Sequence, residues 1–401
     1  MTNSTPMSAI CPSCGCGQVR VFYEAFSAPV NSVLLLSNRE QALSFPTGDI
    51  RLGFCETCGF IYNTAFDRRL VEYSVRCEET QGFSPFFRAW HERLARRLID
   101  RYSLRGKNIV EIGCGKGEFL ALLCDLGENS GIGFDPAYIP ERTSPESASR
   151  IQFIADLYSE RNNAISSDFL CCKMTLEHIA DTASFIGMVR SSLRDSPDTY
   201  VFFQVPDVLR VLEEQAFWDI YYEHCSYFSV GSLARLFRRA GFDVVDVGRE
   251  YNNQYATIEA RPGNGTRTTL AAEDDLEALS TLVQSFATRV PRRIAEWKKR
   301  LEQYREKGLK TVVWGAGSKG VTFLSSLKVC DAVEYVVDIN PHMWGHFMAT
   351  TGVEIIRPLA LREYRPDIVI VMNPVYREEI VAELASLSLT PEVISTRDRV
   401  A

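Results

Sequence analysis

KNIVEIGCGKGEFLALLCDLG, residues Lys107–Gly127, joins an apolar run, a turn with three glycines and an amphipathic segment. The apolar run has the length of a buried strand, and the segment after the glycines has the 3.6-residue period of a helix. A buried strand that turns directly into a helix is typical of α/β proteins with a parallel sheet. This stretch therefore predicts an α/β fold for the centre of the chain.

Further apolar runs follow this stretch, and helical segments separate most of them. Alternating strands and helices predict a parallel sheet, and the last two runs, on either side of Asn252-Asn253, predict an antiparallel pair at one edge. The runs are GIGFD, RIQFIAD, DFLCCKM, TYVFFQVPD, FDVVDVG and QYATIEARP, at 131–135, 150–156, 168–174, 199–207, 242–248 and 254–262.

A second strand, glycine turn and helix occurs near the C-terminus, in KTVVWGAGSKGVTFLSSL at 310–327. The runs VEYVVDIN (333–340) and DIVIVMN (367–373) add two strands, which predicts a second α/β unit. Between the two units, residues 273–308 predict a connecting helical arm with a break or kink at Pro291.

The N-terminal part is rich in cysteine and short apolar runs. Residues 33–36 and 50–54 predict short strands, and residues 84–102 predict a helix. We therefore divide the chain into an N-terminal domain (1–85), an α/β core (86–263), a helical arm (264–308) and a C-terminal Rossmann-like domain (309–401).

Composition excludes several classes of protein. The chain has 401 residues, 44 basic and 51 acidic, with a formal net charge of -7. That balance argues against bulk electrostatic binding to nucleic acid or to an anionic membrane. No signal peptide and no membrane-spanning run is evident, so we expect a cytoplasmic protein with reduced cysteines.

Four cysteines predict a metal site. Cys11-Pro-Ser-Cys14 and Cys55-Glu-Thr-Cys58 are two C-x2-C knuckles, each followed by a glycine. Two knuckles complete a tetrahedral site of four thiolates, with no position left for water, which predicts a structural Zn²⁺. The alternatives are ordinary buried cysteines, or Cys16 in place of Cys14. The other cysteines are expected to be small core residues.

Acidic residues accompany the first glycine turn. Glu111 ends the strand before Gly113, Gly115 and Gly117, while Asp135 and Asp156 end the next two strands. The turn is neither a phosphate loop nor G-x-G-x-x-G. A carboxylate here suits an amino-bearing ligand, and Asp135 stands where a ribose diol is held in nucleotide-binding sheets. The alternative is a generic glycine turn with acids placed by chance.

This set resembles the S-adenosylmethionine site of class I methyltransferases, over about residues 105–262. The resemblance implies that Gly113, Gly115 and Gly117 face the methionine part, Asp135 the ribose hydroxyls and Asp156 the adenine. Lys173 or Met174 is then expected near the sulfonium, and we favour Met174 as a donor-binding residue.

A dense cluster of proton-carrying groups lies at 217–229, FWDIYYEHCSYFS. Tyr221, Glu223 and His224 fall within it, and a neutral imidazole can accept a proton near neutral pH. A neighbouring carboxylate could orient the substrate or stabilise the imidazolium. The alternative is an aromatic core patch with a structural histidine, and His178 is expected to be structural as well.

The order of these features along the chain resembles the sugar C-methyltransferase family: zinc knuckles, a methyltransferase core with Y-x-E-H, a helical arm and a unit opening G-A-x-x-K-G. The resemblance implies methylation of a carbon beside the ketone of a nucleoside-diphosphate sugar. Tyr221, Glu223 and His224 match Y-x-E-H, which implies that His224 is the general base. The chain departs from the family in two places. It has M-T-L-E-H-I at 174–179 where N-x-L-A-H-I is expected, and N-N-Q-Y at 252–255 where G-G-S is expected.

The second glycine turn is open to three interpretations. Gly315-Ala-Gly317-Ser318-Lys319-Gly320 satisfies G-x-G-x-x-G, and Asp338 ends the next strand. We favour binding of the nucleotide diphosphate of the substrate, with Lys319 as its cation; a purely structural turn and an NAD(P) site are the alternatives.

The leading hypothesis is thus an S-adenosylmethionine-dependent methyltransferase that acts on a small molecule, a nucleotide-linked keto sugar. The rivals are a methyltransferase acting on oxygen or nitrogen of another metabolite, and a nucleotide-sugar- or NAD-binding protein without turnover. The sequence leaves the oligomeric state open.

Overall fold

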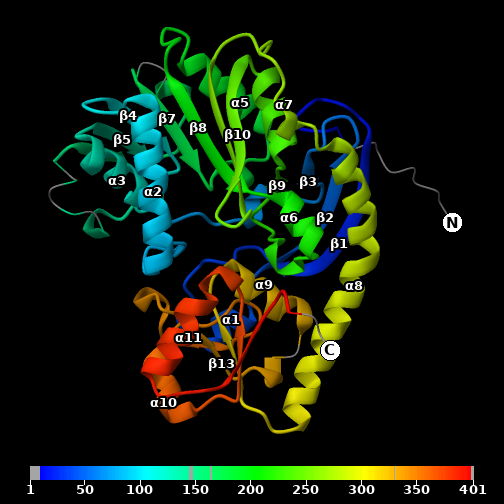
Figure 1. The fold of residues 1–401 in the computed structure, drawn as a ribbon. Coiled ribbons are helices and arrows are strands. Elements are labelled where there is room, and N and C mark those ends of the chain that lie inside the picture. The colour runs from blue at the N-terminus through cyan, green and yellow to red at the C-terminus, as the bar shows by residue number, and fades with distance from the viewer. Residues whose placement is uncertain are drawn as a thin grey trace.

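The computed structural model describes residues 10–398, except 143, 145, 146, 148, 163, 164 and 329. The chain forms three sheets of four, seven and five strands. Figure 1 shows the α/β core at the top, the C-terminal unit at the bottom and the long helix α8 (Leu276–Glu306) joining them along one side.

The core contains the predicted parallel sheet with its antiparallel edge. Its strand order is β10-β11-β8-β7-β4-β5-β6, and β10 and β11 each run antiparallel to their neighbours. All six strand-like runs downstream of the first glycine turn are strands. The bounds are β4 Asn108–Ile112, β5 Ser130–Phe134, β6 Ile151–Ile154, β7 Phe169–Lys173, β8 Tyr200–Pro206, β10 Phe242–Glu250 and β11 Tyr255–Pro262.

Helices cover both faces of this sheet because side chains alternate along each strand. On β7, Phe169 and Cys171 pack with α2 (Pro85–Tyr102) and α3 (Glu118–Gly127) on one face. Leu170 and Cys172 pack with α5 (Thr182–Ser192) and α7 (Val230–Arg239) on the other. Because both faces of the sheet are buried, its strands appear in the sequence as nearly continuous hydrophobic runs.

The N-terminal sheet has the order β1-β2-β3-β9 and is antiparallel. Its strands are β1 Val19–Pro29, β2 Thr47–Cys55, β3 Ile61–Asn63 and β9 Ser226–Tyr227, so the core contributes the fourth strand. The predicted strand at 33–36 is wrong: this segment makes one isolated bridge, Leu34 to Cys77. Strand β1 was not predicted, because two bulges interrupt the alternation of inward- and outward-facing residues along it.

The C-terminal sheet is entirely parallel, with the order β14-β13-β12-β15-β16. Its elements are β12 Thr311–Trp314, α9 Ser318–Leu327, β13 Tyr335–Val337, β14 Glu354–Ile356, α10 Leu361–Tyr364, β15 Ile368–Val371, α11 Arg377–Ser386 and β16 Glu392–Ser395. Helix α8 continues through Pro291, so the predicted break is wrong, while a kink there stays a prediction. Buried residues on either side, among them Val290 and Trp297, anchor the helix against its neighbours.

The N-terminal segment also touches the C-terminal unit. Phe347 N donates to Leu36 O at 2.9 Å, and Thr350 N donates to Ala42 O, in the short helix α1 (Arg39–Leu43), at 2.8 Å. Figure 1 accordingly shows α1 among the elements of the C-terminal unit. No helix in the described ranges combines the length and apolarity needed to span a bilayer.

Candidate active site

The two cysteine knuckles meet in space. Cys11 Sγ lies 3.7 Å from Cys58 Sγ, and Cys14 Sγ lies 3.6 Å from Cys55 Sγ. All four sulfurs are within 4.8 Å of one another. A tetrahedral Zn²⁺ with bonds of about 2.3 Å needs sulfurs about 3.8 Å apart. The four thiols therefore fit a structural zinc ion.

The knuckles take the glycine-dependent turn that their sequence suggests. Gly15 and Gly59 have φ of 75° and 72°, and their amides donate to Cys11 O and Cys55 O. Cys16 is outside the cluster, since its sulfur accepts a hydrogen bond from Thr57 Oγ1 at 3.0 Å. Cys14 is thus the fourth member of the group.

Most of the other cysteines are buried, as expected of core residues. They are Cys77, Cys114, Cys124, Cys171, Cys172 and Cys225. The side chain of Cys330 lies outside the described residues.

The first glycine turn follows β4 and is held against β5. Gly113, Gly115 and Gly117 all have positive φ, and Gly115 N donates to Asp135 Oδ2 at 2.8 Å. Asp135 also accepts from Ala137 N at 2.7 Å and from the Tyr73 hydroxyl at 3.2 Å. The Asp135 carboxylate therefore already accepts a hydrogen bond from one hydroxyl group.

Glu111 is 2% exposed at the end of β4, and its Oε2 has no hydrogen-bond partner. Burial raises the pKa of Glu111 to about 7, although Lys173 opposes the shift. Lys173 Nζ lies 3.8 Å above the centre of the Phe119 ring and 2.5 Å from His91 Nε2. An orphaned buried carboxyl beside the turn suits an amino group of a bound ligand.

A segment of the N-terminal domain, residues 73–80, covers the first glycine turn. Besides the contact of Tyr73, Lys116 Nζ donates to Cys77 O at 3.0 Å, and Thr80 Oγ1 donates to Glu118. We call residues 73–80 the covering segment. Sequence reasoning missed it because nothing in these residues indicates that they pack on the core.

The predicted donor residues accordingly lie in three places. Asp156 is exposed, two residues after the end of β6. Met174, which has φ of 52°, lines the large cavity described next. The turn glycines, Glu111 and Asp135 lie beneath the covering segment and are not among the lining residues of that cavity.

A cavity of about 400 Å³ lies between the core, the N-terminal domain and the C-terminal unit. Both groups of residues that the sequence predicts to bind or activate the methyl acceptor line this cavity. Its lining includes Tyr221, Glu223 and His224, together with Gly315, Gly317, Ser318 and Lys319. The sequence separates these groups by about a hundred residues, but the fold places them around one space.

The predicted catalytic residues are buried and close together. The ring of His224 packs edge-on against Tyr221 and against His178, with centroids 4.7 Å apart in each case. Tyr221 donates through its hydroxyl to Asp219 Oδ1 at 2.9 Å. Burial holds the pKa of His224 well below its usual range, so the imidazole is neutral at neutral pH.

Glu223 has a different partner from the one expected. Its Oε1 accepts from Ser32 N at 2.9 Å and from the Ser32 hydroxyl, while Oε2 has no partner. No hydrogen bond joins Glu223 to His224 within the described part of the chain. Burial raises the pKa of Glu223 to about 7.

Two residues that the sequence did not assign to this site belong to it. His178 contacts His224 and lies with Nδ1 3.0 Å from Glu223 O. Glu177 is 1% exposed on the same short 3-10 helix, Leu176–His178. The sequence did hold a signal for Glu177, because residues 174–179 depart from the family pattern by having this glutamate where alanine is expected.

The second glycine turn repeats the geometry of the first. Gly315 has φ of 118°, and Ala316 N donates to Asp338 Oδ2 at 2.8 Å. Lys319 lines the cavity, but its ammonium is ion-paired with Asp219, at the end of the 3-10 helix Phe217–Asp219. Burial lowers the pKa of Lys319 to about 8 despite that carboxylate.

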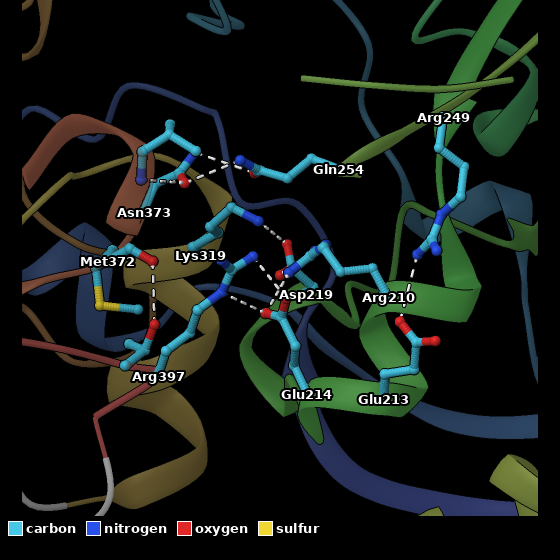
Figure 2. Close-up of polar contacts among 12 residues, drawn as sticks. Arg210, Glu213, Glu214, Asp219, Arg249, Gln254, Lys319, Met372, Asn373 and Arg397 are labelled. Atoms are coloured by element: carbon cyan, nitrogen blue, oxygen red, sulfur yellow. Dashed lines mark hydrogen bonds and ion pairs between the residues drawn. The ribbon is translucent and has the colours of Figure 1, made fainter. Parts of the chain in front are cut away.

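Polar contacts join the α/β core to the C-terminal unit around the ion pair of Lys319 and Asp219 (Figure 2). Arg210, on α6 (Val208–Glu214), binds Asp219 at 2.6 Å, and Glu214 binds Arg397 of the C-terminal unit at 2.5 Å. Gln254 and Asn373 exchange two amide hydrogen bonds of 3.1 Å across the same boundary. Gln254 is one of the residues that departs from the family pattern.

Known families match two parts of the chain. Residues 87–247 match a family described as a methyltransferase domain, and residues 252–390 match one described as a C-methyltransferase C-terminal domain. A relative in sequence is the C-methyltransferase NovU of Streptomyces niveus, 30% identical over 162 residues. That match covers 39% of this chain and only 37% of the length of NovU.

Two solved structures are similar to this chain over less than half of its length. The 1,6-didemethyltoxoflavin-N1-methyltransferase of Burkholderia thailandensis, solved with S-adenosylhomocysteine, is 18% identical with a TM-score of 0.35, covering 45% of this chain and 82% of that one. The PH0226 protein of Pyrococcus horikoshii is 17% identical with a TM-score of 0.37, covering 46% and 94%.

Proposed function

We propose, on the premise that this chain belongs to the C-methyltransferase family, that it transfers a methyl group from S-adenosylmethionine to carbon. The acceptor we propose is a nucleoside-diphosphate keto sugar, methylated next to its ketone. The observation that carries this proposal is the single cavity lined both by Tyr221, Glu223 and His224 and by the second glycine turn. Such a cavity suits a substrate with a reactive sugar at one end and a nucleotide at the other.

His224 is the general base in this proposal. Its neutral imidazole takes the proton next to the ketone, and the electron pair left behind is shared with the carbonyl oxygen as an enolate. The enolate carbon is the nucleophile for the methyl group that S-adenosylmethionine would supply when bound. The packing of Tyr221 against His224 positions the base, since the Tyr221 hydroxyl is fixed by Asp219.

Glu223 is suited to stabilise the enolate oxygen. With a pKa of about 7, its carboxyl is partly protonated near neutral pH, and Ser32 fixes one oxygen. The other oxygen is free to donate a hydrogen bond into the cavity that the residue lines. A donor aimed at the oxygen where charge develops lowers the barrier of such a reaction.

The methyl donor is assigned to the first glycine turn. S-adenosylmethionine supplies an electrophilic methyl group when bound. We assign Glu111 and the glycines to its methionine part, Asp135 to the ribose, Asp156 to the adenine and Met174, which lines the cavity, to the sulfonium. Asp135 already accepts hydrogen bonds from Gly115 N, Ala137 N and the Tyr73 hydroxyl, so a ribose diol that adds two more would compete with Tyr73 for the carboxylate.

The acceptor nucleotide is assigned to Gly315, Gly317, Ser318 and Lys319. A glycine turn at a helix start offers backbone amides to a diphosphate. Lys319 carries three donors, and its one ion pair among the described residues is with Asp219, so it can serve a phosphate as well.

The remaining assignments concern the setting of the protein. Cys11, Cys14, Cys55 and Cys58 hold a structural zinc ion that links the two knuckles. The free thiols of the described cysteines support a cytoplasmic location, and no nucleic-acid or membrane partner is proposed.

A screen of keto sugar nucleotides tests the proposal, with mass detection of a methyl gain of about 14 Da. Uptake of solvent deuterium next to the ketone, without donor, identifies carbon chemistry. A product methylated on oxygen or nitrogen would replace the carbon proposal by its rival. Absence of S-adenosylhomocysteine binding would leave only a non-catalytic binding protein.

His224→Ala tests the base. We expect turnover to fall about 10²- to 10⁴-fold, the usual contribution of a general base, with donor affinity within a few fold. His346→Ala is the matched control, because His346 is partly exposed and is not among the residues that line the cavity. Near-normal turnover of His224→Ala would remove it as the base.

A further inference from the structure

A second group of metal-binding side chains lies in the cavity, apart from the cysteine cluster. Glu177 and His178 come from the 3-10 helix after β7, and His224 comes from the loop before β9. One ligand atom from each residue lies within 4.8 Å of the other two. All three residues line the cavity.

The Glu177 carboxyl group has no hydrogen-bond partner among the described residues. The residue is 1% exposed, and neither carboxyl oxygen makes a hydrogen bond among the described residues. A buried polar group left unsatisfied costs about 1–3 kcal/mol. Such an orphan in a folded protein calls for a ligand that the carboxylate would bind.

His178 is oriented as metal-binding histidines are. Its Nδ1 lies 3.0 Å from Glu223 O, a carbonyl that can only accept, so Nδ1 carries the hydrogen. The lone pair is therefore on Nε2, the nitrogen left for the cluster. A ring nitrogen that donates to a backbone carbonyl while the other binds the ion is the usual arrangement at metal sites.

We propose that Glu177, His178 and His224 bind a divalent transition-metal ion, Zn²⁺ or its analogues Co²⁺ and Ni²⁺. Two imidazoles and one carboxylate form a common donor set for these ions, with a fourth position open to the cavity. Bonds of about 2.1 Å require ligand atoms about 3.4 Å apart, so small side-chain rotations close the site.

Glu177 makes this site a feature of this chain. The sugar C-methyltransferase pattern has alanine at the position of Glu177, in N-x-L-A-H-I. Without this carboxylate, His178 and His224 would offer only two ligands. The replacement of alanine by glutamate completes a set of three.

Occupancy of this site has a consequence for catalysis that rests on the proposed function. An imidazole has one basic lone pair, so His224 cannot bind the ion and accept the substrate proton at the same time. The ion therefore inhibits turnover, with a midpoint equal to its dissociation constant. The existence of the site does not depend on turnover.

Cobalt titration of the full-length, zinc-loaded protein tests the site. We expect one further equivalent of Co²⁺, with visible d–d bands and no thiolate-to-metal absorption. No further uptake, or uptake only with the thiolate absorption of the cysteine cluster, would overturn the proposal. S-adenosylhomocysteine binding, measured separately, reports on the proposed function whatever the cobalt result.

Variants of Glu177 assign the ligands. Glu177→Ala, which restores the family residue, and the isosteric Glu177→Gln should each weaken Co²⁺ binding at least tenfold. Glu383→Gln, a carboxyl of α11 on the same cavity, should bind Co²⁺ as the parent does. Equal affinity in both Glu177 variants and the parent would show that Glu177 is no ligand, and would overturn the site.

Discussion

The two glycine turns of this chain are built alike and used differently. In each, the amide of the turn donates at 2.8 Å to the acid that ends the next strand: Gly115 to Asp135, and Ala316 to Asp338. That acid also accepts from the amide two residues further on, in Ala137 and Asn340. The covering segment lies over the first turn, while the second turn opens into the cavity.

The lysines of the two turns show the same contrast. Lys116 is buried and donates to two backbone carbonyls, Cys77 O and Ala137 O, so it fastens the covering segment to the core. Lys319 instead pairs with Asp219 across the boundary between units. Both turns thus share the hydrogen bond from a turn amide to the acid of the next strand, but their surroundings differ.

The glycines of the two turns should differ most in their tolerance of a side chain. Gly113 has φ of 68°, and an added methyl would overlap the Thr175 side chain, whereas Gly317 has an ordinary φ and open space. Gly113→Ala should lose about 3 kcal/mol of unfolding free energy and Gly317→Ala less than about 1 kcal/mol. Urea denaturation measures both, and equal losses would contradict the contrast.

The two acids should separate donor from acceptor. Asp135→Asn should weaken S-adenosylhomocysteine binding about 10- to 100-fold, because a charged hydrogen bond to the ribose is lost. Asp338→Asn should leave that affinity within a few fold and raise the KM for the acceptor instead. Calorimetry and steady-state kinetics give the two readouts.

The two lysines should have smaller effects of different kinds. Lys319→Met should raise the acceptor KM about tenfold, the value of one charge-assisted contact. Lys116→Met should release the covering segment, seen as faster amide hydrogen exchange over 73–80. If the KM for the acceptor were unchanged in Lys319→Met, the second glycine turn would have a structural role only.

The last effect concerns pH. Burial opposes ionisation of Asp219, but Arg210 and Lys319 outweigh it and hold the pKa of Asp219 well below its usual range. Its ion pairs therefore contribute stability above the unfolded pKa, near pH 4, and this contribution is lost as pH falls through the folded pKa. The unfolding free energy should fall by about 2 kcal/mol more between pH 5 and pH 2 in the parent than in Asp219→Asn.

The sequence was sufficient for those parts of the fold that depend on local pattern. Buried parallel strands appear in the sequence as apolar runs, and the glycine turns appear as short motifs, so both α/β units were predictable. The paired knuckles were predictable from their two C-x2-C motifs. Strand β1 was not, because its bulges break the alternation. The continuous α8 was not, because tertiary packing overrides the proline.

The site was predictable only where its residues are neighbours in sequence. Tyr221, Glu223 and His224 form one motif, but their partners come from elsewhere: Ser32 from the N-terminal domain and His178 from the end of β7. The pairing of Lys319 with Asp219 joins two units and leaves no trace in either local pattern. Long-range packing decides these contacts.

Calorimetric titration of S-adenosylhomocysteine into the parent, Asp135→Asn and Asp338→Asn tests the central claim, that the first turn binds the methyl donor and the second does not. The account predicts one binding site per chain in the parent, an affinity 10- to 100-fold weaker in Asp135→Asn, and near-parent affinity in Asp338→Asn. No binding to the parent, or a loss confined to Asp338→Asn, would contradict it.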